Sequence, residues 1–227
     1  MHGSSGRIGL MSIVQAQSDF ESDLGLWLLV YEELATRRSF TASSDFTLED
    51  ECLLEGMLSR IWQSWCKFCR TLFIQSCLGT STPSQPILAL PQAVSEQSVS
   101  QAVIHAKKGK HPYWQGVNSV LRYEPTWGDC DVLLDVVNKL SPANATNLKD
   151  VCVIGDPGAG ILQTIRNAAA HNNVETSLAL QRKSAAYFTF PIAHPVQALF
   201  WVDSASSDHL IVAAVEALRA ASVQAVL

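Results

Sequence analysis

Apolar residues recur at steps of three and four along most of the chain, the spacing that places them on one face of an α-helix. The first such stretch runs from about Ile13 to Phe40. A second begins after Thr47 and continues to Gly79. Thr47 and Asp50 form a capping box in which aspartate replaces the usual glutamate, which predicts where this second helix begins.

The second helix carries aromatic residues at helical spacing, Trp62, Trp65 and Phe68. An aromatic stripe can stack nucleobases, but this spacing favours a place in the core. Cys66 and Cys69 lie in the same stretch at the two-residue spacing of a zinc or redox pair. No second Cys/His pair follows at a suitable distance, so we expect both thiols to pack as small apolar groups and predict no metal site.

Prolines divide the chain after the second helix. Three of them in residues 79–94 predict a linker or an excursion between two helical halves. Shorter helices are expected from about Ser95 to Ala106 and across "WGDCDVLLDVVNKLSP", where Pro142 stops the second of these. Residues 187–201 contain two prolines with some alternation and predict at most a short extended segment before a final helix capped by Ser206 or Ser207.

The stretch "VCVIGDPGAGILQTI" resembles a strand, a glycine-rich loop and a helix, the arrangement that cradles phosphate. Its glycines are spaced G-x-x-G-x-G, and no Lys-Ser/Thr pair follows, so the dinucleotide and Walker patterns are both absent. Pro157 also removes an amide donor. We therefore expect a helix that Asp156 caps and whose first turn holds Pro157, with the glycines allowing close packing. These elements predict an all-α fold in a single domain spanning residues 13–227.

The balance of charges restricts the partners. A net charge of −5 and a pI of about 5.6 argue against a protein that coats nucleic acid or anionic membrane through bulk charge. The best local basic patch is "HAKKGKHPYW", in which Lys107, Lys108 and Lys110 are candidates for contact with a substrate's phosphate backbone, and a solvated loop is the alternative.

Neither a secretory signal nor an apolar run of about 20 residues is present, so we expect reduced thiols, a cytoplasmic location and no membrane partner. Residues 1–12 resemble an artificial tag and are left out of the predicted domain.

Arg166, Asn167 and His171 stand out in "IRNAAAHN", with three alanines between the asparagine and the histidine. This segment resembles the R-N-x-x-x-H signature of the HEPN superfamily, all-helical proteins whose active members are metal-independent ribonucleases. About eight residues carry the specific match. The resemblance implies an up-and-down helical bundle with extra helices, an RNA substrate, no cofactor, and a catalytic set of Arg166, Asn167 and His171.

The spacing of Arg166 and His171 also has a geometric consequence. Five residues at roughly 100° each place the two side chains roughly 140° apart around a straight helix. One helix would not aim both at one phosphate, whereas two copies related by a two-fold axis can, and small Ala168, Ala169 and Ala170 permit their approach. We therefore expect a homodimer with a composite site, as the HEPN resemblance also implies.

In that site His171 would take or give a proton, Arg166 would hold the scissile phosphate and Asn167 would orient one of them. The resemblance implies a toxin or antiviral defence effector, with an antitoxin or another regulatory protein as a possible partner. One departure is Asn173, which stands where toxins regulated by nucleotidyl transfer have tyrosine in R-x-x-x-x-H-x-Y. Two other hypotheses stay open: a non-catalytic helical interaction module, and nucleotide binding through Gly155–Gly160.

Overall fold

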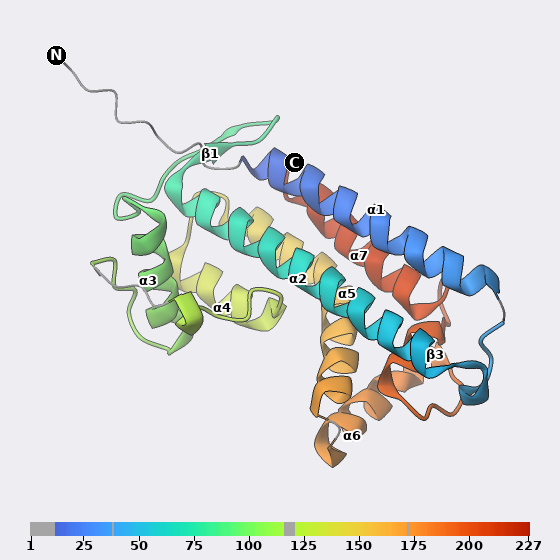
Figure 1. Ribbon diagram of the computed structural model, residues 1–227. Helices are drawn as coiled ribbons and strands as arrows, with labels where there is room; N and C mark the ends of the chain where they lie inside the picture. Colours follow the sequence, from blue (N-terminus) through green and yellow to red (C-terminus); the bar gives the residue numbers. More distant parts are fainter. Residues whose placement is uncertain (1–11, 38, 116–120, 172) are drawn as a thin grey trace.

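The computed structural model describes residues 12–37, 39–115, 121–171 and 173–227, and α-helices dominate them (Figure 1). The α-helices are α1 (Ile13–Arg37), α2 (Leu48–Leu78), α3 (Glu96–Lys107), α4 (Cys130–Leu140), α5 (Ala145–His171), α6 (Val174–Lys183) and α7 (Leu210–Gln224). Short 3₁₀ helices are η1 (Ser43–Asp45), η2 (Leu121–Tyr123), η3 (Ser184–Ala186) and η4 (Pro195–Phe200). The all-α prediction is confirmed; the tag-like segment lies outside the described residues except for Ser12.

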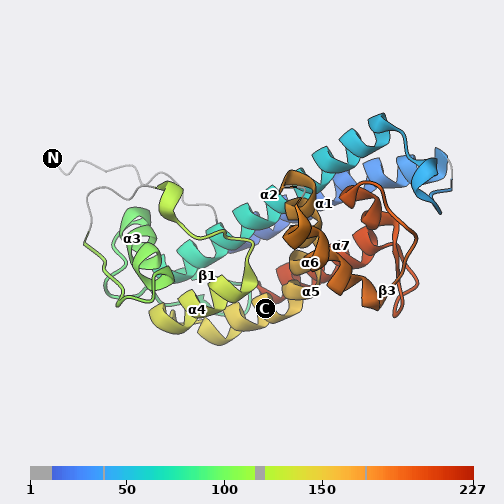
Figure 2. The same ribbon diagram turned by 90° about the horizontal axis from the view of Figure 1, so that it is seen from below.

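Helices α1, α2, α5 and α7 pack together as the main bundle. Helices α3 and α4 lie towards the end of α2 that leads to β1, and α6 projects from the bundle after α5 (Figures 1 and 2). Helix α5 contacts α7, α4, α6 and α2, so it is the central element. Among the described ranges, no helix combines the length and the apolar composition needed to cross a membrane.

The start and the aromatic face of α2 agree with the sequence. The Thr47 side chain accepts a hydrogen bond from the Asp50 amide, and the Asp50 carboxylate accepts one from the Thr47 amide, so the capping box is confirmed. Trp62, Trp65 and Phe68 are buried in the hydrophobic core, where Phe20 of α1 stacks on Phe68. The stripe is therefore core and is not available to stack nucleobases.

The glycine stretch differs from the prediction. Helix α5 begins at Ala145 and runs unbroken through Gly155–Gly160, with Pro157 inside it, so there is no strand before the glycines and Asp156 caps nothing. Proline removes one backbone hydrogen bond, to the carbonyl four residues earlier. Pro157 and Val153 are both exposed, so water can satisfy that carbonyl. The apolar residues before Gly155 follow the helical period, with Val151 and Cys152 buried and Val153 exposed.

Close packing explains two of the glycines. A Cβ at Gly158 would lie 2.3 Å from the carbonyl oxygen of Ala214 in α7, and one at Gly155 would lie 2.9 Å from the Trp65 ring. Helix α7 at Ala214 and helix α2 at Trp65 therefore approach α5 more closely than a side chain on either glycine would permit. The expectation that these glycines allow close packing is confirmed, but they do so within the helix and not at its entry.

The proline-rich segments form small antiparallel pairs. Residues 79–94 contain β1 (Thr80–Ser81) and β2 (Pro86–Ile87), and β3 (Tyr187–Phe188) pairs with β4 (Val202–Asp203). The short extended segment expected within 187–201 is confirmed at β3. The predicted serine cap of the last helix is wrong, because His209 precedes α7 without a side-chain cap and the Ser206 amide bonds to Asp203 instead.

Candidate functional site

The three motif residues lie in the last two turns of α5. Ile165 and Ala168 point into the core, whereas Arg166 and His171 are exposed and Asn167 is half-buried. His171 is the last residue of the helix. The apolar period of α5 thus keeps the motif side chains out of the core and leaves them at the surface, where a substrate can reach them.

Arg166 lines a hollow of about 210 Å³ between the end of α5 and α2. Helix α2 contributes Glu55, Leu58 and Ser59 to this hollow, and α5 contributes Ala169 and Ala170 beside Arg166. Because both alanines are small, the guanidinium has free space in front of it. The hollow can accept a small anionic group, since Arg presents several donors in a planar fork.

A single chain does not bring Arg166 and His171 together. Arg166 faces α2, and the helical geometry places His171 roughly 140° around the axis from it. His171 does not line the hollow that contains Arg166. The need for a second chain to complete a composite site therefore stays a prediction.

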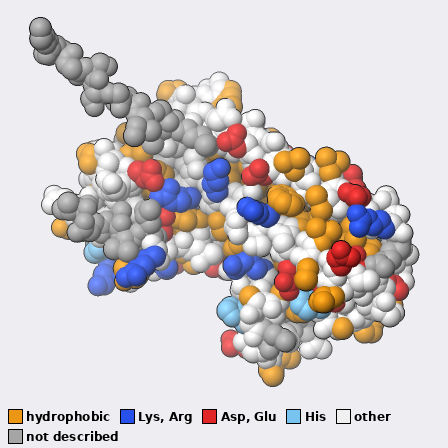
Figure 3. Space-filling model, viewed as in Figure 1, with side chains coloured by type: hydrophobic (Ala, Val, Ile, Leu, Met, Phe, Trp, Pro, Cys, Tyr) orange, Lys and Arg blue, Asp and Glu red, His pale blue; other side chains and the backbone are white. Residues whose placement is uncertain are grey.

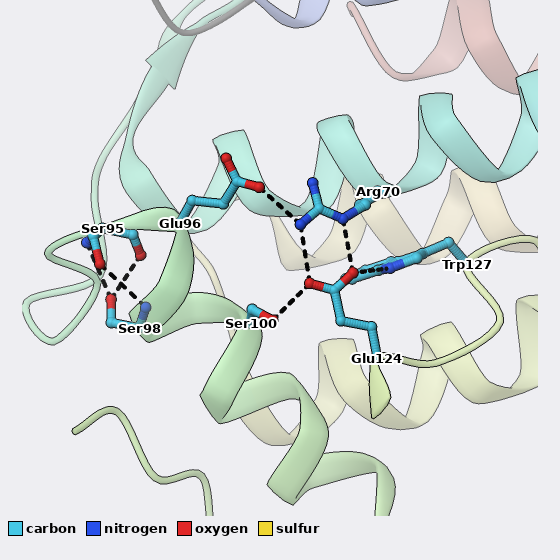
Figure 4. A network of polar contacts seen from close by, with 7 residues as sticks. All are labelled: Arg70, Ser95, Glu96, Ser98, Ser100, Glu124 and Trp127. Carbon is cyan, nitrogen blue, oxygen red and sulfur yellow. Dashed lines mark hydrogen bonds and ion pairs between the residues drawn. The ribbon is translucent and has the colours of Figure 1, made fainter. Parts of the chain in front are cut away.

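The motif side chains also have no polar partner within the described ranges: no hydrogen bond or ion pair holds the side chains of Arg166, Asn167 or His171. Arg70 of α2 shows the opposite situation. Its guanidinium donates to both carboxylate oxygens of Glu124, at 2.7 and 3.0 Å, and pairs with Glu96 at 2.8 Å (Figure 4). Arg70 is bound within the fold, and Arg166 is not.

The positive charge of Arg166 acts on the thiol of Cys66 in α2. Burial raises the pKa of the Cys66 thiol to about 11, although Arg166 and a hydrogen bond to Gly128 act in the opposite direction. Burial also raises the pKa of the Cys69 thiol. Both cysteines are free, and Cys69 is fully enclosed while Cys66 is half-buried. Protonated, packed thiols agree with the predicted core role and disfavour a reactive pair.

Sequence reasoning missed the α2 side of the hollow. Glu55 lines it, and its carboxylate pairs with His194 Nε2 at 3.2 Å, while His194 Nδ1 accepts a hydrogen bond from the Val196 amide. Val196 belongs to η4, so this pair ties η4 to α2. Glu55 and Ser59 are four apart on α2, and this polar spacing alone could have marked that helix face.

Lys107, Lys108 and Lys110 lie elsewhere, at the end of α3 and in the turn that follows it, and all three are exposed. The structure does not bring them together with Arg166, which lies towards α6 (Figures 1 and 2). They are therefore a separate surface and not part of the hollow at the end of α5.

The glycine stretch offers no phosphate loop. Residues 155–160 are helix interior, so their backbone amides follow the helical hydrogen-bonding pattern instead of pointing together at a ligand. The hypothesis of nucleotide binding through Gly155–Gly160 is therefore wrong. Within the described ranges, no group of three or more His, Cys, Asp or Glu residues is placed to hold a metal ion.

No known protein family, curated protein or solved structure matches this chain in sequence or fold comparisons. The case for the candidate site therefore comes from its residues and their geometry.

Proposed function

We propose that this protein is a metal-independent endoribonuclease of the HEPN type, with Arg166, Asn167 and His171 as its catalytic residues. The observation that carries the proposal is the state of these side chains: all three reach the surface at one end of α5 and none has a polar partner within the described ranges. Buried charged and polar groups are normally paired, as the partly buried Arg70 is with Glu96 and Glu124. Arg166 beside its hollow and His171 at the helix end are exposed and unpaired, so both are free to bind a substrate.

The chemistry follows from the residue types. Imidazole can take and give a proton near neutral pH, so His171 removes the proton of the ribose 2′-hydroxyl or protonates the leaving 5′-oxygen. The 2′-oxygen attacks phosphorus, the bond from phosphorus to the 5′-oxygen breaks, and the products are a 2′,3′-cyclic phosphate and a 5′-hydroxyl. Arg166 holds the phosphate and offsets the charge that develops in the transition state. Asn167 orients the phosphate or the imidazole.

Two copies of the chain complete the site in this proposal. Because Arg166 and His171 diverge on one helix, the arginine of one protomer acts with the histidine of the other across a two-fold axis. Ala169 and Ala170 leave room beside Arg166. Exposed Val174 and Leu178 of α6 follow His171 on the chain and supply apolar surface for such a contact.

The experiment uses purified protein and RNA in EDTA, with mass spectrometry of the product ends. Wild type should leave 2′,3′-cyclic phosphates, and Arg166→Ala and His171→Ala should each lose about 10²–10⁴-fold in rate, the usual contribution of such groups. Arg37→Ala, which removes an exposed arginine at the end of α1, is the matched control and should cleave as wild type does. The proposal fails if wild-type dimers leave RNA intact or if both motif variants cleave normally.

Mixing the two inactive variants tests the composite site. A dimer of one Arg166→Ala chain and one His171→Ala chain retains one arginine and one histidine on opposite protomers. Activity should return in the mixture if the residues act across the dimer. Continued inactivity of heterodimers shown to form would overturn the shared site, because the pair would then act within one chain.

The physiological side of the proposal, a cytoplasmic toxin or defence effector restrained by an antitoxin or regulatory protein, follows from the HEPN resemblance. The exposed Val174 and Leu178 favour a second candidate, a non-catalytic module that binds a partner protein through the same face. Retained partner binding with no cleavage by wild type would select this second function.

A further inference from the structure

One segment of the chain carries a net positive charge, whereas the rest is net negative. Residues 97–123 contain Lys107, Lys108, Lys110 and Arg122 and no acidic residue. The other 200 residues carry twelve basic and 21 acidic residues, a formal charge of −9, against +4 for this segment. A local basic surface on an acidic protein attracts an anion without making the whole molecule bind anions.

These cations are not neutralised by the fold. In the part of the chain that the structure describes, none of the four lies within ion-pairing distance of a carboxylate. All four are exposed, and Figure 3 shows Lys and Arg side chains at the edge of the molecule where α3 lies. Lys107 Nζ donates to the Glu124 carbonyl oxygen at 3.2 Å, which leaves its charge uncompensated.

The nearest acidic side chain after the segment, Glu124, is turned away from this surface. Its side chain is only 6% exposed, and Arg70, Ser100 and Trp127 donate hydrogen bonds to its carboxylate (Figure 4). The hydrogen bonds and the charge of Arg70 hold the pKa of Glu124 below its usual range, against the raising effect of burial. The negative charge is thus paired internally, and the surface above it stays basic.

One exposed aromatic ring, Tyr123, lies among the cations, and a second, Tyr113, follows Lys110 by three residues and contacts the His105 ring. Tyr113 is 49% exposed and Tyr123 is 48% exposed. The Arg122 guanidinium lies 4.9 Å from the centre of the Tyr123 ring, and Lys108 Nζ lies 5.7 Å from it. A large aromatic ring that is already exposed offers a flat face to a ligand, so the fold does not need to open for the ligand to bind there.

Tyr113 also lines a groove. It borders a hollow of about 470 Å³ together with Pro112, Trp114, Gln115, Gln92 and Val94. This groove therefore has two aromatic side chains and two polar amides in its lining, and it begins two residues after Lys110 in the chain. A flat ring of nucleobase size can enter it and stack, while the lysines meet the phosphates that follow.

We propose that the surface formed by Lys107, Lys108, Lys110, Arg122, Tyr113 and Tyr123, here called the basic-aromatic surface, binds single-stranded nucleic acid, with phosphates on the cations and bases stacked on the tyrosines. Cations alone would accept any polyanion, but cations interleaved with exposed rings match a strand whose bases are unpaired. That this strand is RNA rests on the proposed function. The basic-aromatic surface does not include Arg166, Asn167 or His171, which line or flank a different hollow.

The test measures fluorescence anisotropy of a labelled 2′-O-methyl 12-mer, which cannot be cleaved because its 2′-hydroxyls are blocked. Lys107→Gln/Lys108→Gln/Lys110→Gln should weaken binding at least tenfold and lower the slope of log K against log salt by about two. Tyr113→Ala should weaken it about tenfold, as expected for one lost stack, with the salt slope unchanged. Because the probe cannot be cleaved, its binding is measured whether or not the chain has nuclease activity, which separates this inference from the nuclease proposal.

The matched control removes three cations elsewhere, Arg37→Gln/Lys149→Gln/Arg182→Gln, and should bind as wild type does. Lys108→Glu is a second single variant at an exposed position, so a folding defect in the triple variant would not prevent the test. The inference fails if the control loses as much affinity as the lysine triple, or if Tyr113→Ala is neutral. It also fails if a duplex or a poly-glutamate peptide of equal charge binds as tightly as the single strand.

Discussion

The two halves of α5 differ in what their special residues do. In the first half Gly155 and Gly158 lie against Trp65 and Ala214, so packing accounts for them fully. In the second half Arg166 and His171 reach the surface with no polar partner among the described residues. One helix thus carries a set of residues that the fold requires and a set that it does not, and only the second set is free to act on a substrate.

Arg70 of α2 and Arg166 of α5 repeat this contrast. Arg70 is enclosed by Glu96 and Glu124, and Ser100 and Trp127 complete the bonds of the shared carboxylate (Figure 4). Arg166 faces a hollow. Comparing the stability of Arg70 and Arg166 variants shows which arginine the fold needs, and the comparison requires no assay of activity.

The largest expected effect is at Gly158. Because a Cβ there would meet the backbone oxygen of Ala214 at 2.3 Å, α5 and α7 must separate, and Gly158→Ala should lower the free energy of unfolding by about 3 kcal/mol. Gly160→Ala is the matched control, since its Cβ would meet the flexible end of Lys183 at 3.3 Å and the Asp156 carboxylate at 3.5 Å, and no backbone atom. It should change the free energy of unfolding by less than about 1 kcal/mol, in either direction. Urea unfolding followed by circular dichroism measures both, and equal effects would contradict the close packing.

Arg70→Ala should have the next largest effect. It removes the cation that neutralises the largely buried Glu124, so we expect a loss of about 2 kcal/mol in the free energy of unfolding. Arg166→Ala removes an arginine without polar partners and should change it by less than about 0.5 kcal/mol. Urea unfolding measures the free energy of unfolding of both variants. A decrease for Arg166→Ala as large as that for Arg70→Ala would show that Arg166 stabilises the fold.

Much of this contrast between the halves of α5 lies beyond what the sequence predicts. Local signals were sufficient for α2, because the Thr47 cap and the aromatic period act within one helix. They misplaced the start of α5, because Gly and Pro normally interrupt helices and the contacts that keep this helix continuous come from Trp65 and Ala214, far away in the chain.

The candidate site divides in the same way. The motif and the surface exposure of Arg166 and His171 follow from the period of α5, since both fall outside its apolar face. The hollow beside Arg166 did not follow, because Glu55 and Ser59 come from another helix more than 100 residues earlier. The pair formed by Glu55 and His194 was equally beyond reach, since nothing local links α2 to η4.

The Glu124 cluster should also make stability depend on pH. Because the folded-state pKa of Glu124 is lowered from its ordinary value of 4.5, its ionised form stabilises the fold fully above that value. This contribution is lost as the pH falls from 4.5 through the lowered folded-state pKa. Glu124→Gln should therefore be less stable than wild type at pH 7, and the difference should shrink in acid. Urea unfolding across this range measures it, and a constant difference would contradict the assignment.

The smallest expected effect on stability is at His171, the residue of α5 that we expect the fold to need least. This imidazole ends α5, is exposed and has no polar partner among the described residues, so His171→Ala should change the free energy of unfolding by less than about 0.5 kcal/mol. Ile165→Ala, six residues earlier on the buried face, is the control and should lose about 3 kcal/mol in the free energy of unfolding. A loss above about 1 kcal/mol at His171 would make it a structural residue and remove the reason to assign it a catalytic role. Unchanged stability together with lost RNA cleavage would instead place its contribution in the reaction, because the fold would have been shown not to need it.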